Sequence, residues 1–339
     1  MIQKEIPVIK WWLFSASLLF GCRLSSDAPD ISHIDINLPL YHLEDKIWNL
    51  DTTDLRAELD TLFVEHPDFS DVFFNQILTY PGIEMSPVIN TITFLRDPDM
   101  RKLYSSVSQE FPDFAQFERD FVRAMQYYKY YFPDAVIPAI YTCVTGLGVG
   151  AFSIGEEILG IGLEFYLGED YSMYDPQLFP SYIRRTMNPD HLVAKTMQAL
   201  LEAKVGETSG IRMLDFMIRN GKVLYLKEKI MPFVSDTVIL EFTPGQITWL
   251  KEHERQIWAH FLESELLYST DYRKFQKLIT PSPNVPNMPP ETPGRAGNWI
   301  GLQIIRSFMA RNSEVSLEKL LYETDAQSIL ARSRYKPEM

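Results

Sequence analysis

Cys22 is the residue with the most clearly defined chemistry in this chain. It directly follows Gly21, and the ten-residue apolar block 11–20 precedes that pair, behind a start that contains Lys4 and Lys10. A basic start, an apolar middle and a small residue before the cleavage point are typical of a secretory signal peptide. A cysteine directly after the small residue predicts a bacterial lipobox, in which the thiol and the new amino group of the mature chain are both acylated.

Two other interpretations of this segment are possible. It could be a membrane anchor that is never cleaved, but a helix that spans a bilayer needs about 20 apolar residues. It could also be a buried helix with an incidental cysteine. Neither alternative explains the basic start, the Gly-Cys pair and the polar stretch after it together, so the sequence favours a lipoprotein with Cys22 as the lipid attachment point.

A second candidate for chemistry is the segment 191–195, which reads H-L-V-A-K. Zinc peptidases carry H-E-x-x-H on a helix, where two imidazoles one turn apart bind the metal and the glutamate acts as a base. Here His191 holds the first position, but Leu192 stands at the position of the base and Lys195 at that of the second ligand. The segment predicts a disarmed peptidase motif, or simply an exposed histidine near the start of a helix.

The segment 253–257, H-E-R-Q-I, is another near match that lacks the second histidine. At about 100° per residue, Glu254 falls inside the apolar stripe of its helix. A carboxylate in that position must be paired or protonated, and we expect a structural ion pair with Arg295 or Arg306. The alternative is a metal-dependent hydrolase site with His191, Glu254 and His253 as ligands.

Two further segments resemble functional motifs less closely. The run 146–151 fits the G-x-G-x-x-A form of a dinucleotide fingerprint, but the fingerprint needs a helix next and a short strand over 151–154 is predicted instead. We therefore expect a plain turn. Cys143 lies in an apolar run with no visible base nearby, so it is expected to be a small buried hydrophobe rather than a catalytic thiol.

The chain has 339 residues and a formal net charge of −13, with 32 Lys and Arg against 45 Asp and Glu. An acidic chain is a poor partner for phosphate backbones, which argues against nucleic-acid binding. It also cannot hold an anionic membrane by charge, so attachment must come through lipid, at about 0.8 kcal/mol per buried CH₂ group. With 21 Phe, 17 Tyr and 6 Trp, the chain can build a sizeable core.

The predicted organisation is a signal peptide over 1–21, a polar tether over 22–35 and one globular domain over 36–339. Helices dominate this domain. Capping residues and helical spacing predict helices after Thr52 or Thr53, Asp97-Pro98, Asn188-Pro189, Thr243-Pro244 and Asp325, an aromatic core stripe over 114–128, and a helix over Ala296–Arg311. Six prolines between 281 and 293 indicate an extended loop.

A small sheet is expected near the middle of the chain. One strand is predicted over 135–145, with Pro138 at its start or at a sheet edge, and another over 158–167 with a single buried face. The fold class is therefore α+β, mainly helical. A small sheet between helices is also the arrangement that invites comparison with zinc peptidases.

Four stretches carry a resemblance to a known family: 159–171, 266–271, 293–301 and the tail over 324–337. Together they resemble the gliding-motility lipoprotein GldB family of Bacteroidetes, from roughly Ile36 to the C-terminus. The resemblance implies a cell-envelope lipoprotein that gliding members need for movement on surfaces, with a role alongside the associated secretion apparatus. It also implies a zincin-like fold related to predicted zinc peptidases. Cys22 is the one functional residue that it carries over.

The sequence thus predicts a non-catalytic lipoprotein of the cell envelope, without a cofactor, that acts through contacts with envelope proteins of the gliding and secretion machinery. The lipid on Cys22 would hold it to a membrane, and the choice between inner and outer membrane is left open. Two alternatives remain: the zinc-dependent hydrolase described above, and a glycan- or peptide-binding module, which the many Tyr and Trp residues suggest.

Overall fold

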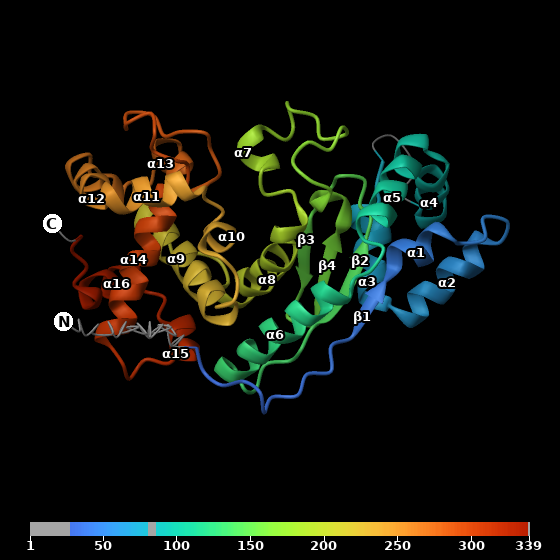
Figure 1. Cartoon of the computed structure of the whole chain (residues 1–339), viewed down its shortest axis with the longest axis horizontal. Coiled ribbons are helices and arrows are strands. Elements are labelled where there is room, and N and C mark those ends of the chain that lie inside the picture. The colour runs from blue at the N-terminus through green and yellow to red at the C-terminus, as the bar shows by residue number, and fades with distance from the viewer. Residues whose placement is uncertain (1–27, 81–85, 338–339) are drawn as a thin grey trace, which may run out of the picture.

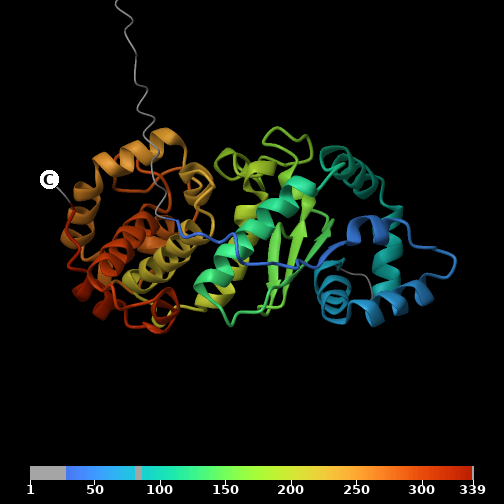
Figure 2. The same cartoon turned by 60° about the horizontal axis from the view of Figure 1, so that its bottom comes forward.

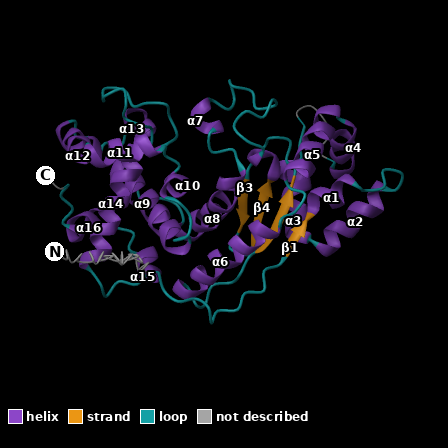
Figure 3. Ribbon diagram, in the orientation of Figure 1, coloured by secondary structure: helices purple, strands orange, loops and turns teal. Residues whose placement is uncertain are grey.

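The computed structural model describes residues 28–80 and 86–337, so the predicted signal peptide and Cys22 lie outside the described residues (Figure 1). The predicted fold class, α+β and mainly helical with a small sheet near the middle of the chain, is confirmed. The sheet lies between two groups of helices, and one contiguous hydrophobic cluster extends through both (Figure 3).

Four short strands form the sheet in the order β1-β2-β4-β3. Strand β2 runs parallel to both β1 and β4, whereas the edge strand β3 is antiparallel to β4. The strand predicted over 135–145 is shorter, because β2 spans only Ala139–Cys143. Pro138 directly precedes it, as expected for a strand start, whereas the alternative of a sheet edge is wrong because β2 is central. The strand bounds are β1 (Leu40–His42), β2 (Ala139–Cys143), β3 (Ala151–Ile154) and β4 (Ile158–Gly162).

The strand predicted over 158–167 is shorter and more deeply buried than expected. It ends at Gly162, and the chain continues as a 3₁₀ helix, η2 (Leu163–Tyr166). All five residues of β4 are buried, so the prediction of a single buried face is wrong. The ring of Phe152 packs directly on Gly160 and would overlap a Cβ at that position. The ring therefore covers the strand at the residue that has no side chain.

The helices before and beside the sheet come from the first part of the chain (Figure 2). The aromatic stripe is core, as predicted: Phe121, Met125 and Tyr128 have no exposed surface. The predicted cap of α2 is wrong, because Thr53 donates to Asp51 in a preceding turn and Asp54 takes the N-cap position. The bounds are α1 (Leu43–Trp48), α2 (Leu55–Glu65), α3 (Pro67–Val72), the π-helix η1 (Phe73–Ile77), α4 (Pro87–Arg96), α5 (Pro98–Glu110) and α6 (Ala115–Tyr131).

The second group of helices follows the sheet in the sequence. Helices α5, α8 and α11 begin at their prolines, and α14 spans the residues predicted for it. Asp325 caps the last helix through its carboxylate, as predicted. The bounds are α7 (Ser181–Arg184), α8 (Pro189–Val205), α9 (Met213–Ile230), α10 (Asp236–Leu240), α11 (Pro244–Glu252), α12 (Glu254–Glu263), η3 (Leu266–Tyr268), α13 (Tyr272–Ile279), α14 (Ala296–Arg311), α15 (Leu317–Tyr322) and α16 (Ala326–Ser333).

Helix α8 connects the two groups, because it packs against β3 and β4 on one side and against α9 on the other. Helices α9 and α14 cross at the centre of the second group, where Gly221 and Gly301 bring the two backbones together.

The segment 28–39 precedes β1 as an extended chain. It begins beside the second group of helices and crosses the molecule to the sheet (Figures 1 and 2). Gln126 of α6 donates to the carbonyl of Ile34 at 2.8 Å, and Ala28 and Ile31 pack against the core. The described start of the chain is thus fixed to the globule.

Candidate functional site

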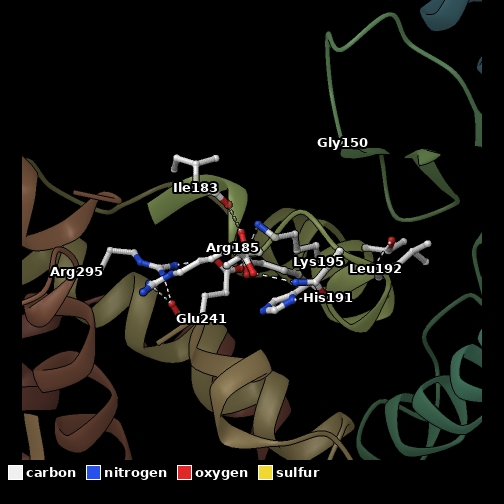
Figure 4. A network of polar contacts seen from close by, with 12 residues as sticks. Gly150, Ile183, Arg185, His191, Leu192, Lys195, Glu241 and Arg295 are labelled. Carbon is white, nitrogen blue, oxygen red and sulfur yellow. Dashed lines mark hydrogen bonds and ion pairs between the residues drawn. The ribbon is translucent and has the colours of Figure 1, made fainter. Parts of the chain in front are cut away.

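A cleft lies between the sheet and the second group of helices. Its cavity has a volume of about 470 Å³ and is lined by residues at the start of β3, in η2 and after α7, and by α8, α9, α10 and the start of α14. Most lining side chains are apolar. Two of the polar ones, Lys195 and Arg295, pair with Glu241, which follows the last residue of α10 (Figure 4).

The carboxylate of Glu241 is paired with two cations from different helices. Arg295 Nη1 lies 2.9 Å from Oε2 and Lys195 Nζ lies 3.6 Å from Oε1. The Glu241 side chain is 9% exposed, so these pairs are largely shielded from water. Glu241 and Arg295 both have a left-handed backbone, at φ 55° and 65°, which brings the end of α10 and the start of α14 together.

The backbone of Glu241 is held as well. Arg295 Nη2 and Arg185 Nη2 donate to its carbonyl oxygen at 2.9 and 2.7 Å, and Arg185 Nη1 also donates to Gln246 Oε1 at 2.8 Å. The last carbonyls of a helix have no partner within the helix and carry partial negative charge. The two guanidinium groups therefore cap α10 at the same point at which Arg295 binds the Glu241 side chain.

A fourth cation lies behind the cavity wall. Lys227 of α9 has no exposed surface, and its Nζ donates to Gln198 Oε1 at 2.8 Å. Burial lowers the pKa of Lys227 to about 8, with the charge of Glu241 opposing this shift and those of Lys195 and Arg295 adding to it. The lysine therefore keeps most of its charge at neutral pH, close to Lys195 and Arg295.

These cations decide the charge of Glu241. Burial by itself would raise the pKa of this carboxyl, but Lys195, Arg295 and Lys227 together hold the pKa well below its ordinary value of 4.5. Glu241 is accordingly an anion at every pH at which the protein is expected to work.

His191 is buried at the start of α8, and the prediction of an exposed histidine is wrong. Its Nδ1 lies 2.9 Å from Asn188 Oδ1, and burial lowers its pKa to about 4, so the ring is neutral at pH 7. The next residue, Leu192, has no exposed surface and packs in the core.

Lys195 lies one turn after His191, and its ammonium forms the ion pair with Glu241. A zinc site needs lone-pair donors at these positions, and an ammonium opposes a divalent cation. The residues present at the peptidase motif therefore do not fit a zinc ion.

The buried His191 predicts a pH dependence of stability. Its pKa is about 4 in the folded chain and about 6.5 in the unfolded one, so the unfolded state binds more protons between these values and stability rises with pH across that window. The effect amounts to about 3 kcal/mol across the window. We expect His191→Gln to flatten this rise in urea unfolding between pH 4.5 and 6.5. An unchanged slope would contradict the assignment.

Glu254 lies elsewhere, and the predicted ion pair is wrong. Its carboxylate accepts hydrogen bonds from Trp299 Nε1 at 3.3 Å and from the Tyr335 hydroxyl at 2.8 Å. The two expected partners are engaged with other carboxylates, Arg295 with Glu241 and Arg306 with Glu228.

The neighbouring His253 stacks on Trp249, with ring centroids 4.4 Å apart. Within residues 28–80 and 86–337, no group of three or more His, Cys, Asp or Glu side chains is arranged to hold a metal ion. The described structure therefore does not assemble His191, His253 and Glu254 into a metal site.

The glycine run before β3 forms a turn around the buried side chain of Glu164, whose pKa burial raises. The carboxylate of Glu164, which is fully buried, accepts hydrogen bonds from the Thr145 and Leu147 amides at 2.6 and 3.0 Å. Thr145 Oγ1 accepts from the amides of Gly148 and Val149. Loop amides that would face a nucleotide phosphate are thus bound within the chain, in agreement with the expected plain turn.

The thiol of Cys143 is fully buried and lies 3.4 Å from the Ile161 carbonyl, so the predicted small core residue is confirmed. Beside it, Thr142 Oγ1 lies 3.0 Å from His42 Nδ1 and bonds to Glu44, which ties β1 and α1 to β2. Sequence reasoning missed this cluster, because its members lie about 100 residues apart. The buried hydroxyl of Thr142 makes the cluster structural.

Sequence reasoning also missed Glu241, Arg185 and Lys227. One signal was present: Glu241 is a lone carboxylate in the apolar run 238–242, between a helix and the Thr243-Pro244 cap. Such a carboxylate requires a buried cationic partner, although the run does not reveal which one.

Aromatic side chains do not gather in the cleft as an exposed binding surface. The exposed large tyrosines are spread over β1, α6, η3, α13 and α15: Tyr41, Tyr130, Tyr268, Tyr272 and Tyr322. The abundance of aromatics therefore reflects the core and does not itself indicate a glycan-binding groove.

Comparison with known protein families gives a match along nearly the whole chain. The model of the gliding motility protein GldB family matches residues 25–337. The chain belongs to the gliding motility protein GldB family. No curated protein and no solved structure matched the chain.

Two of the stretches that resemble the GldB family have a clear structural role. The stretch 159–171 contains Glu164, which binds the glycine turn, and the stretch 293–301 contains Arg295 and Gly301. The GldB resemblance thus includes one cation of the cleft and the glycine at the crossing of α9 and α14.

Proposed function

We propose that this chain is a non-catalytic lipoprotein of the cell envelope that supports gliding motility and the associated secretion machinery through contacts with other envelope proteins. Its membership of the gliding motility protein GldB family supports the link to motility. The lipobox at Cys22 supports attachment to a membrane by acyl chains.

The observation that carries the non-catalytic part is the ion pair between Lys195 and Glu241 at 3.6 Å. In a zinc peptidase, a second imidazole would stand at position 195 and a glutamate at 192. Leucine cannot accept a proton, and the ammonium of Lys195 pairs with a carboxylate and offers no lone pair to a metal. We infer that the fold is a zincin-like frame in which this internal cation replaces metal chemistry.

Attachment through lipid agrees with the rest of the chain. Among the residues that the structure describes, no helix is long and apolar enough to cross a membrane. A formal charge of −13 gives no electrostatic attraction to anionic lipids. Two or more acyl chains on Cys22 would give stable anchoring without either.

A complementation experiment tests this proposal. Deletion of the gene in its native organism should impair colony spreading, where the organism glides, or secretion, and the wild-type chain should restore it. Cys22→Ser should move the protein from the membrane fraction to the soluble fraction and fail to restore the phenotype, although its globular domain is unchanged. Normal spreading and secretion in the deletion strain, or membrane fractionation of the Cys22→Ser variant, would refute it.

Metal analysis of the purified chain tests the alternative of a zinc-dependent hydrolase. We expect far less than one zinc per chain after dialysis against buffer with added zinc. Near-stoichiometric zinc that is lost on His191→Gln would restore the hydrolase hypothesis.

A further inference from the structure

The cations around Glu241 outnumber the carboxylates that act on them by one, in a chain that is acidic overall. Lys195 and Arg295 line the cavity, while Arg185 and Lys227 stand behind them. Against these four cations stand three carboxylates: Glu241 and Glu202 line the cavity, and Glu169 acts on Arg185. Glu241 is already bound by Arg295 and Lys195, and Glu202 Oε1 accepts from Gln198.

Such a surplus at a shielded site is costly unless an anion offsets it. The Lys227 ammonium has three donors and one hydrogen bond within the described chain, to Gln198. Lys195 is 28% exposed and Arg295 is 16% exposed, so both remain open to the cavity. An entering anionic group would meet these two side chains first, with the other two cations reinforcing the attraction.

Part of the cavity lining comes from the start of the edge strand β3. Gly150 and Ala151 line the cavity, and β3 pairs only with β4. The amide of Gly162 donates to the carbonyl of Gly150, so Gly150 and Phe152 turn their backbone groups toward β4. By the alternation of an antiparallel ladder, Ala151 and Ser153 turn theirs to the open edge.

Within residues 28–80 and 86–337, no hydrogen bond reaches these outward backbone groups of β3. An unpaired strand edge is a template for another extended chain. A cavity of about 470 Å³ with mostly apolar lining suits a few residues of such a chain and not a folded domain. Phosphate or nucleic acid would use the cations but would leave the strand edge unpaired.

We propose that the cleft binds an extended peptide segment of a partner protein, with a peptide carboxylate on Lys195 and Arg295 and the peptide backbone along the edge of β3. This inference states what kind of partner the protein would bind. It rests on the proposed function only where it assigns the peptide to an envelope protein. The carboxylate is either a chain terminus or an acidic side chain, and the two sources are separable by experiment.

The test uses the purified full chain in detergent and an immobilised library of hexapeptides in two forms, one with free C-termini and one with C-terminal amides. If the carboxylate is a chain terminus, the binders should be enriched in peptides with free C-termini. If it is an acidic side chain, the amidated peptides that bind should be enriched in Asp and Glu. For the best binder, conversion of the carboxylate to the amide should weaken binding at least tenfold. The peptide has two sets of alternate backbone nitrogens, of which only one would face β3. Methylation of that set should weaken binding at least tenfold, and methylation of the other set should not. Both changes are made on the peptide and leave the protein fold intact.

Variants of the protein provide the complementary test. Lys195→Met and Arg295→Met should each weaken binding of the selected peptide at least tenfold, with folding checked by circular dichroism. Arg273→Met is the matched control, because Arg273 is 87% exposed on α13 and should leave binding unchanged.

Three results would overturn the inference: no hexapeptide binds, amide and carboxylate forms bind equally, or inorganic phosphate competes as strongly as the selected peptide. These outcomes are distinct from failure of the proposed function. Peptide binding without any motility or secretion defect in the deletion strain would refute the function and leave the site intact.

Discussion

Gly301→Ala is expected to destabilise the chain severely, by about 3 kcal/mol or more in the free energy of unfolding. At the crossing of α9 and α14, a Cβ on residue 301 would overlap the carbonyl oxygen of Met217. The obstruction is backbone, so relief requires the two helices to move apart. Because Ile300, Ile304 and Leu302 on α14 are fully buried, that movement would open the core.

The sign of this effect is informative, because alanine is favoured over glycine by about 1 kcal/mol in an unobstructed helix. Gly245→Ala provides the matched control: Gly245 lies in the first turn of α11, and a Cβ there has nothing within 4 Å. We expect this variant to be neutral or slightly more stable in urea unfolding. Equal effects at the two positions would show that the close approach at Gly301 does not govern the packing.

Glu241→Gln is expected to cost about 3–5 kcal/mol, the range for breaking a buried ion pair by removing one partner. The amide keeps the shape of the side chain but leaves Lys195, Arg295 and Lys227 without their shared counter-charge. The hydrogen bonds from Arg185 and Arg295 to the backbone carbonyl remain, so the end of α10 keeps its cap. The loss of stability should therefore measure the contribution of the Glu241 charge and not a change in the local backbone.

Urea unfolding at pH 7 measures this effect, with Glu65→Gln as the control. Glu65 also pairs with a lysine, Lys46, but both side chains are more than 40% exposed, so its loss should cost far less than that of Glu241. A similarly small loss in Glu241→Gln would contradict the role of the buried carboxylate.

The same carboxylate makes the stability of the folded chain depend on pH in the acidic range. Because the pKa of Glu241 is lowered in the folded chain, its contribution is complete above the unfolded value of 4.5 and is lost as the pH falls toward the folded value. The Glu241→Gln variant should lack this acid-dependent part.

The positions of several helices could be predicted from the sequence, because their signals are local. A capping side chain followed by a first-turn proline marks α5 at Asp97, and the same pattern with Thr243 marks α11. Both are decided by residues within one turn of each other. The spacing of apolar residues over Ala296–Arg311 likewise shows a helix without reference to the rest of the fold.

Pairings between distant residues could not be predicted in this way. Glu254 was expected to need an arginine, but Trp299 and Tyr335 supply neutral donors. Arg295 instead bonds to Glu241, which lies 54 residues earlier in the chain. Burial of both faces of β4 depends on Phe152 lying over Gly160, and no spacing rule within the strand reveals this. For Glu254 the helical spacing indicated a shielded carboxylate but not which donors would meet it.

The extended segment before β1 limits how far the globule could stand from a membrane. The described chain begins beside the second group of helices, and only six peptide steps separate its first residue from Cys22 (Figure 1). A fully extended chain advances at most about 3.6 Å per residue, so the stand-off between the acylated cysteine and the globule is limited to roughly 20 Å. Lipidation at Cys22 would therefore keep the second group of helices, beside which the described chain begins, within roughly that distance of the lipid headgroups.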